Sequence, residues 1–198
     1  MMNNINKIIW DKFRIKRGGA PPFLGWKSTR VTLAQLFLDL GFINGAEIGV
    51  QNGVYSEVLL KNNPNLQLMC VDPWRAYHGV TQEQSDKAYD WAISRLEPYK
   101  DRVTILRETS VEAARNVPDA SLDFVYIDGA HDFNNVMLDI LHWYPKVKRY
   151  GIFSGHDYYI FFRGGVVRAV DTFTQAHNIN QWYMTHETLR SWFWVVDW

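Results

Sequence analysis

Two acids and two glycines are the residues of this sequence best suited to hold a small ligand. The segment 45–53 ends a short apolar run with Glu47, Gly49 and Gly53, and residues 54–60 then have the pattern of a helix. This order predicts a strand, a tight glycine loop and a helix N-terminus. Glycine lets the backbone turn sharply and approach a ligand closely.

The second acid, Asp72, ends the apolar segment 66–72, which predicts a second strand. A glycine loop after one strand and an acid after the next is how a Rossmann-type domain holds a nucleoside. Because an ionised carboxylate offers two acceptor oxygens, we expect Asp72 to accept hydrogen bonds from both ribose hydroxyls. Pro73 and Trp74 would then lie near the adenine, where Trp74 either stacks on the base or simply packs in the core.

The position of Glu47 inside the glycine motif indicates which kind of cofactor the loop binds. Dinucleotide-binding enzymes seat a pyrophosphate with G-x-G-x-x-G, whereas this chain has E-x-G-x-x-x-G. S-adenosylmethionine has no phosphate, and its ammonium and sulfonium groups suit a nearby carboxylate. We therefore expect Glu47, Gly49 and Gly53 to surround the methionine part of S-adenosylmethionine. The alternative is a strand-to-helix turn that binds no ligand.

Four motifs together make the chain resemble the class I S-adenosylmethionine-dependent methyltransferases, and among them the macrocin-type O-methyltransferase group. The motifs are E-I-G-V-Q-N-G (47–53), V-D-P-W (71–74), Y-I-D-G-A-H-D-F (126–133) and G-I-F-S-G-H-D-Y (151–158). Each motif alone would be weak evidence, but their combination in this order is fairly specific.

The resemblance implies a metal-assisted site after the later strands. It implies that Asp128 is a divalent-metal ligand with a catalytic role beside the cofactor, that His131 is the general base, and that Asp157 is the second metal ligand. His156 stands where the macrocin-type enzymes would have a carboxylate, and we count it as a third ligand. Mg²⁺ prefers carboxylate oxygen, whereas imidazole suits Mn²⁺, Fe²⁺ or Zn²⁺ better, so we expect Mg²⁺ or Mn²⁺. Alternatively, Asp128 and Asp157 are strand-end acids that cap neighbouring helices.

Thr109 and Ser110 follow a further predicted strand, 103–106. The resemblance implies that both touch the edge of the adenine. However, Thr109 and Glu112 also have the spacing of a capping box, so a helix cap would explain these residues without any ligand.

Alternating strand and helix patterns predict an α/β fold. We expect a single Rossmann-like, doubly wound sheet, mostly parallel, with a C-terminal antiparallel hairpin strand formed by 181–186 and 191–196. Residues 1–27 are expected to be an N-terminal arm, loosely packed or acting as a flap. Residues 28–198 would then form the methyltransferase domain, with an insertion at 73–100.

The composition limits the classes of partner. Lys and Arg number 21, as do Asp and Glu, and this balance argues against a nucleic-acid substrate. No apolar run has the length of a membrane span or of a signal-peptide core, so we expect no membrane association and a cytoplasmic location. The expected partner is a small-molecule acceptor such as a sugar, catechol or polyketide-like diol.

Three other functions are alternatives to this one. The sequence does not determine the oligomeric state, and a homo-oligomer is one possibility. A metal-independent methyltransferase is the nearest rival. A non-catalytic nucleotide-binding module would not need Asp128, His131 and Asp157 together. A nicotinamide-dependent oxidoreductase should contain G-x-G-x-x-G, which the sequence lacks.

Overall fold

A single mixed sheet forms the centre of the molecule in the computed structural model, which describes residues 1–16, 18–77, 79–160 and 162–198. Position 17 of the expected arm and position 78 of the expected insertion therefore lie outside the described residues. The strands are β1 (Phe23–Leu24), β2 (Asn44–Ile48), β3 (Gln67–Val71), β4 (Val103–Leu106), β5 (Leu122–Ile127), β6 (Val147–Gly155), β7 (Trp182–Met184) and β8 (Trp192–Val195).

The strand order is β1-β7-β8-β6-β5-β2-β3-β4. Strands β4, β3, β2, β5 and β6 pair in parallel, while β8 is antiparallel to both of its neighbours, β6 and β7. This arrangement confirms the predicted fold class, including the antiparallel strand near the C-terminus. The chain reverses its direction of winding between β2 and β5, which is where open α/β sheets bind their ligands.

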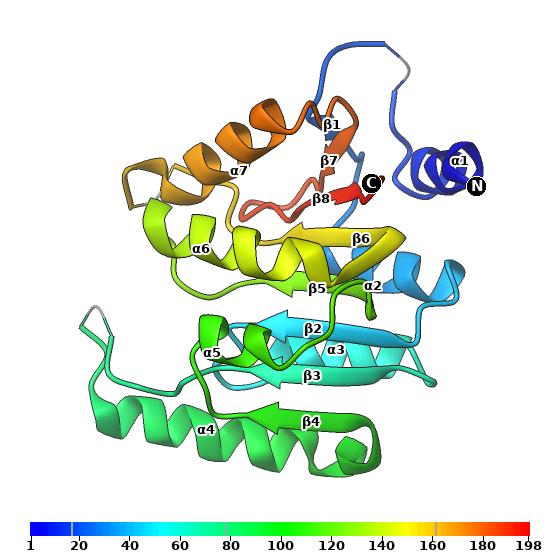
Figure 1. Cartoon of the computed structure of the whole chain (residues 1–198). Helices are drawn as coiled ribbons and strands as arrows, with labels where there is room; N and C mark the ends of the chain where they lie inside the picture. Colours follow the sequence, from blue (N-terminus) through cyan, green and yellow to red (C-terminus); the bar gives the residue numbers. More distant parts are fainter. Residues whose placement is uncertain (17, 78, 161) are drawn as a thin grey trace.

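Helices cover both faces of the sheet, as Figure 1 shows. They are α1 (Met2–Lys12), α2 (Arg30–Asp39), α3 (Val54–Asn62), α4 (Gln82–Leu96), α5 (Ser110–Arg115), α6 (Phe133–Trp143) and α7 (Gly165–Ala176), with short 3₁₀ turns at Glu97–Arg102, Tyr144–Lys146 and Phe162–Gly164. One apolar core joins the sheet to α1–α4, and a second joins it to α5–α7. A sheet buried on both faces explains the nearly continuous apolar sequence of its central strands.

The N-terminal arm is part of the domain, so the expectation of a loosely packed arm was wrong. Ile9 and Phe13 are fully buried, and the ring of Phe13 lies 4.9 Å from the ring of Phe193 in β8. Ile5, Ile9 and Phe13 recur at every fourth position, which gives α1 one apolar face toward the core. Strand β1 then adds to the edge of the sheet by pairing in parallel with β7.

The segment expected as an insertion supplies a regular element of the fold. Helix α4 connects β3 to β4, which are neighbouring parallel strands, so α4 is a crossover helix of the sheet. Thr81 caps its first turn through a capping box with Gln84. Among the described residues, no helix has both the length and the apolar composition needed to cross a membrane.

Candidate active site

The loop between β2 and α3 packs directly against the end of β5. Gly49 has a φ of +91°, and a Cβ atom added there would lie 2.3 Å from the carbonyl oxygen of Asp128. Only glycine therefore fits this position, both for its backbone conformation and for the space. The contact joins the two strands between which the winding reverses.

Asp72 holds the same loop from the other side. One oxygen of its carboxylate accepts hydrogen bonds from the backbone N–H groups of Val50 (3.0 Å) and Gln51 (2.9 Å), and the other accepts from Trp74 (2.7 Å). Asp72 thus fixes the glycine loop to the end of β3. Each carboxylate oxygen can accept more than one hydrogen bond, so the contact with the ribose hydroxyls stays a prediction.

Trp74 lies in the core, and Pro73 beside it is half-buried. The Trp74 side chain packs edge-on against Tyr89 at 4.9 Å, and its indole N–H donates to the carbonyl of Gln51 at 2.8 Å. Only 2% of Trp74 is exposed, so its ring offers no open face to an adenine in this arrangement. The contacts therefore agree with core packing, and stacking on adenine stays a prediction.

Thr109 and Ser110 both have structural partners. The Thr109 hydroxyl caps α5, and Glu112 completes the capping box. The Ser110 hydroxyl accepts a hydrogen bond of 2.8 Å from the indole N–H of Trp143. These bonds explain both residues as parts of the fold, and their contact with adenine stays a prediction.

Glu47 differs from the accessible carboxylate that we expected beside the loop. It is 1% exposed and hydrogen-bonded to the hydroxyl of Ser56 in α3. Burial raises the pKa of Glu47 to about 8, because the charged form loses its hydration. Glu47 is therefore mostly protonated at pH 7. Gly53, which begins α3 in a left-handed conformation, lies against α4.

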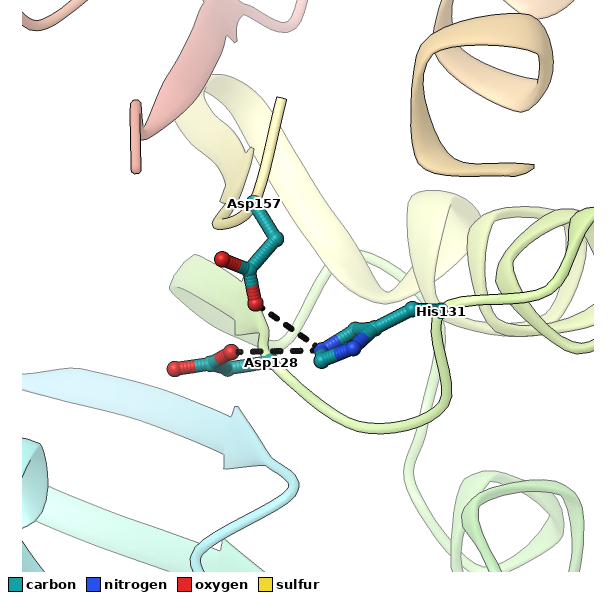
Figure 2. A group of neighbouring side chains, drawn as sticks. All are labelled: Asp128, His131 and Asp157. Carbon is teal, nitrogen blue, oxygen red and sulfur yellow. Dashed lines mark ion pairs between the residues drawn. The ribbon is translucent and has the colours of Figure 1, made fainter. Parts of the chain in front are cut away.

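Three of the predicted site residues converge beyond β5 and β6, as Figure 2 shows. The Nε2 atom of His131 lies 2.9 Å from Oδ2 of Asp157 and 4.0 Å from Oδ1 of Asp128. One ligand atom from each of the three residues lies within 4.8 Å of the others. Asp157 adopts a φ of +54°, an uncommon conformation that Asp tolerates better than most residues.

His156 lies beside this group but outside the set of possible metal ligands. Its Nδ1 is 3.4 Å from Oδ1 of Asp157 and 3.7 Å from Oδ1 of Asp128. Although burial lowers the pKa of His156, the hydrogen bonds and charges of the two carboxylates raise it to about 9. A protonated imidazole cannot ligate a metal. The role of His156 as a metal ligand stays a prediction.

The surroundings of Asp157 strongly affect its pKa. Burial opposes ionisation of Asp157, but the hydrogen bonds and charges of His131 and His156 outweigh it and hold the pKa of Asp157 well below its usual range. The hydrogen bond to Asp157 is also the main reason that the pKa of His131 is raised, against the effect of burial. The site therefore contains an ionised Asp157 beside a protonated His156.

Two further residues make contacts near the site, of which Arg30 was not predicted from the sequence. Arg30, in the first turn of α2, has its Nη1 atom 3.9 Å from Oδ2 of Asp128. The Tyr77 hydroxyl donates to the Asp132 carboxylate at 3.1 Å and so links the loop after β3 to the loop after β5. Both contacts join segments far apart in the chain, and neither Arg30 nor Tyr77 lies in one of the four motifs.

Comparison with known proteins agrees with this geometry. Residues 46–158 match the model of a family described as a methyltransferase domain. The chain belongs to this family. Together with the sheet order, this membership makes the protein a class I S-adenosylmethionine-dependent methyltransferase, which confirms the resemblance seen in the sequence.

Solved structures share the fold at low sequence identity. An O-methyltransferase from Bacillus cereus, solved with S-adenosylhomocysteine, is 14% identical with a TM-score of 0.63, over 98% of this chain and 91% of that one. The O-methyltransferase NovP is 15% identical with a TM-score of 0.64, over 85% of this chain and 80% of its own.

One curated relative also matches the sequence. This relative, the uncharacterized protein y4gI of Sinorhizobium fredii, is 24% identical over 115 residues. The match covers 57% of this chain and only 12% of y4gI.

The buried Glu47 predicts an unusual dependence of stability on pH. Its pKa is about 8 in the folded protein against an ordinary 4.5, so the unfolded chain releases the proton first. The free energy of unfolding should therefore fall as the pH rises from about 4.5 to 8, by about 1.4 kcal/mol per unit of pKa difference. In Glu47→Gln this component should vanish. Urea unfolding at several pH values measures it.

The matched control is Glu83→Gln, because Glu83 is an exposed glutamate of α4. That variant should keep the pH dependence of the wild type. Equal slopes in the wild type and Glu47→Gln would contradict the assignment of a buried, protonated Glu47.

Proposed function

We propose that this protein transfers the methyl group of S-adenosylmethionine to a hydroxyl of a small molecule, with the assistance of a divalent metal. The observation that carries the proposal is the convergence of Asp128, His131 and Asp157 beside the glycine loop of a methyltransferase fold. The acceptor class we favour is a diol that can chelate a metal, such as a sugar, a catechol or a polyketide-like compound. The O-methyltransferases among the structural neighbours support this reaction type.

The residues around the glycine loop fit S-adenosylmethionine. Gly49 lets the loop pack directly against the backbone of Asp128, and Asp72, which is only partly buried, holds the loop at the end of β3. When bound, S-adenosylmethionine supplies an electrophilic methyl group on a sulfonium. The protein's task is to hold donor and acceptor in line, which can lower the barrier by about 7–11 kcal/mol in favourable cases.

The acidic end of the site fits a divalent cation. Asp128 and Asp157 present carboxylate oxygens, which Mg²⁺ and Mn²⁺ prefer, and these lie close enough to share one ion. A metal held there would lower the pKa of an acceptor hydroxyl. Two carboxylates this close need positive charge near them, and in this structure His156 provides it.

His131 is the residue we assign to remove the proton from the acceptor hydroxyl. Its Nε2 atom is buried against both carboxylates, while the side chain as a whole is about one-third exposed. The 2.9 Å contact of Nε2 with Asp157 orients the ring. The same nitrogen cannot hold both a metal and a proton, so in this assignment the metal is left to the two acids and the proton to His131.

A metal-independent mechanism is the second candidate, because one observation favours it. The 2.9 Å contact between His131 and Asp157 already forms a base oriented by a carboxylate, without any cation. Removal of metal separates the two mechanisms.

Replacement of His131 tests its role as the base. We expect His131→Ala to lower kcat by about 10²- to 10⁴-fold, the usual contribution of a general base, and to leave the affinity for S-adenosylhomocysteine nearly unchanged. Turnover on a panel of catechols, sugars and polyketide diols and titration calorimetry measure the two quantities. His142→Ala is the matched control, because the half-buried His142 lies in the last turn of α6 and contacts the Leu138 carbonyl of the same helix. Turnover of His131→Ala at the wild-type rate would remove His131 from the mechanism.

A chelator tests the metal. Activity should disappear in EDTA and return with Mg²⁺ or Mn²⁺. Asp157→Asn should abolish this rescue while preserving the backbone, because Asn also tolerates the left-handed conformation at this position. Full activity of the chelated wild type would instead establish the metal-independent mechanism.

A further inference from the structure

Arg30 lies at the edge of the site, where hydrogen bonds to its backbone hold it in place and leave its guanidinium available to a ligand. Its backbone N–H donates to Oε1 of Glu187 at 2.8 Å, and its carbonyl accepts from the Tyr55 hydroxyl at 3.0 Å. The guanidinium lies over the Tyr55 ring, 5.3 Å from its centre. Backbone clamps and a stacked ring together fix the position of the cation before any ligand binds.

The guanidinium has unused hydrogen-bonding capacity. It carries five N–H donors. Within the described part of the chain, its one acidic partner closer than 4 Å is Asp128, at 3.9 Å, which is too long for a hydrogen bond. The Arg30 side chain is 33% exposed, so solvent or a ligand can reach it.

Arg30 approaches Asp128 from the side of the cofactor loop. It lies nearest to Oδ2 of Asp128, whereas His131 and His156 lie nearest to Oδ1. Its charge also acts on Glu47 in β2. Arg30 therefore lies near the ends of β2 and β5, beside the cluster of His131 and Asp157.

The direction of the cofactor follows from the proposed function, on which this inference rests. With the ribose at Asp72 on β3, the methionine part that we expect at Glu47 and Gly49 would lie at the end of β2, which is the strand between β3 and β5. Its terminal amino-acid group carries one ammonium and one carboxylate. A neighbouring acid and guanidinium have the complementary charges.

We propose that Arg30 binds the carboxylate of the methionine part of S-adenosylmethionine, while the Oδ2 side of Asp128 faces its ammonium group. The protein then recognises the cofactor by its amino-acid end as well as by its ribose. A guanidinium matches a carboxylate with two parallel hydrogen bonds, which a lysine cannot reproduce.

The experiment compares two ligands by titration calorimetry. S-adenosylhomocysteine has the carboxylate, and S-adenosyl-3-thiopropylamine is the same molecule without it. Wild type should bind the first more tightly. Arg30→Gln should bind S-adenosylhomocysteine about 10- to 100-fold more weakly, as expected for the loss of charged hydrogen bonds, and should bind the decarboxylated ligand nearly as well as wild type does. The preference for the carboxylate should therefore largely disappear.

Arg149→Gln is the control, because Arg149 pairs with Asp197 at the start of β6, away from the site, and this variant should keep the wild-type preference. Weaker binding of both ligands by Arg30→Gln would assign Arg30 a structural role and overturn the inference. Unchanged affinity for S-adenosylhomocysteine would also overturn it and would direct attention to an anionic acceptor. A wild type that binds neither ligand would overturn the proposed function itself.

Discussion

The close contact between Gly49 and the backbone of Asp128 is the constraint on which the site depends. Because no side chain separates the two strands there, the glycine loop and the acids beyond β5 share one small space. Asp72 then fixes this loop to the end of β3 by accepting two hydrogen bonds from the loop backbone. This arrangement would bring the methyl group of a cofactor bound at the loop close to an acceptor hydroxyl bound at the acids.

The balance of charge around Asp128 and Asp157 is the second organising feature. Three groups approach these carboxylates: His131, His156 and Arg30. The pKa of His156 is raised by the acids to about 9, so in this structure His156 offsets part of the charge that a metal would otherwise offset. Binding of a divalent cation would therefore compete with the proton of His156.

The elements with strong local patterns could be predicted from the sequence. Short-range periodicity or spacing predicts the strand that ends at Ile48, the capping box at Thr109 and the C-terminal hairpin. The structure contains each of them. The convergence of Asp128, His131 and Asp157 was also accessible, because parallel strands end at one edge.

The missed features depend on distant packing. The arm was expected to be loose, yet Phe13 packs on Phe193, a partner 180 residues away in the chain that no local pattern identifies. The burial of Glu47 and Trp74 depends on α3 and on Tyr89, so their spacing in the motifs predicted proximity to a cofactor without revealing their exposure. Arg30 likewise reaches Asp128 only through the tertiary fold.

The central claim is that the space between the glycine loop and β5 holds S-adenosylmethionine. Titration calorimetry of the wild type and Gly49→Ala with S-adenosylhomocysteine tests it most directly, since the added methyl group would collide with the Asp128 carbonyl. The account predicts binding with one site per chain in the wild type and a large loss of affinity in a folded Gly49→Ala. Absence of binding in the wild type, or equal affinity in the two proteins, would contradict it.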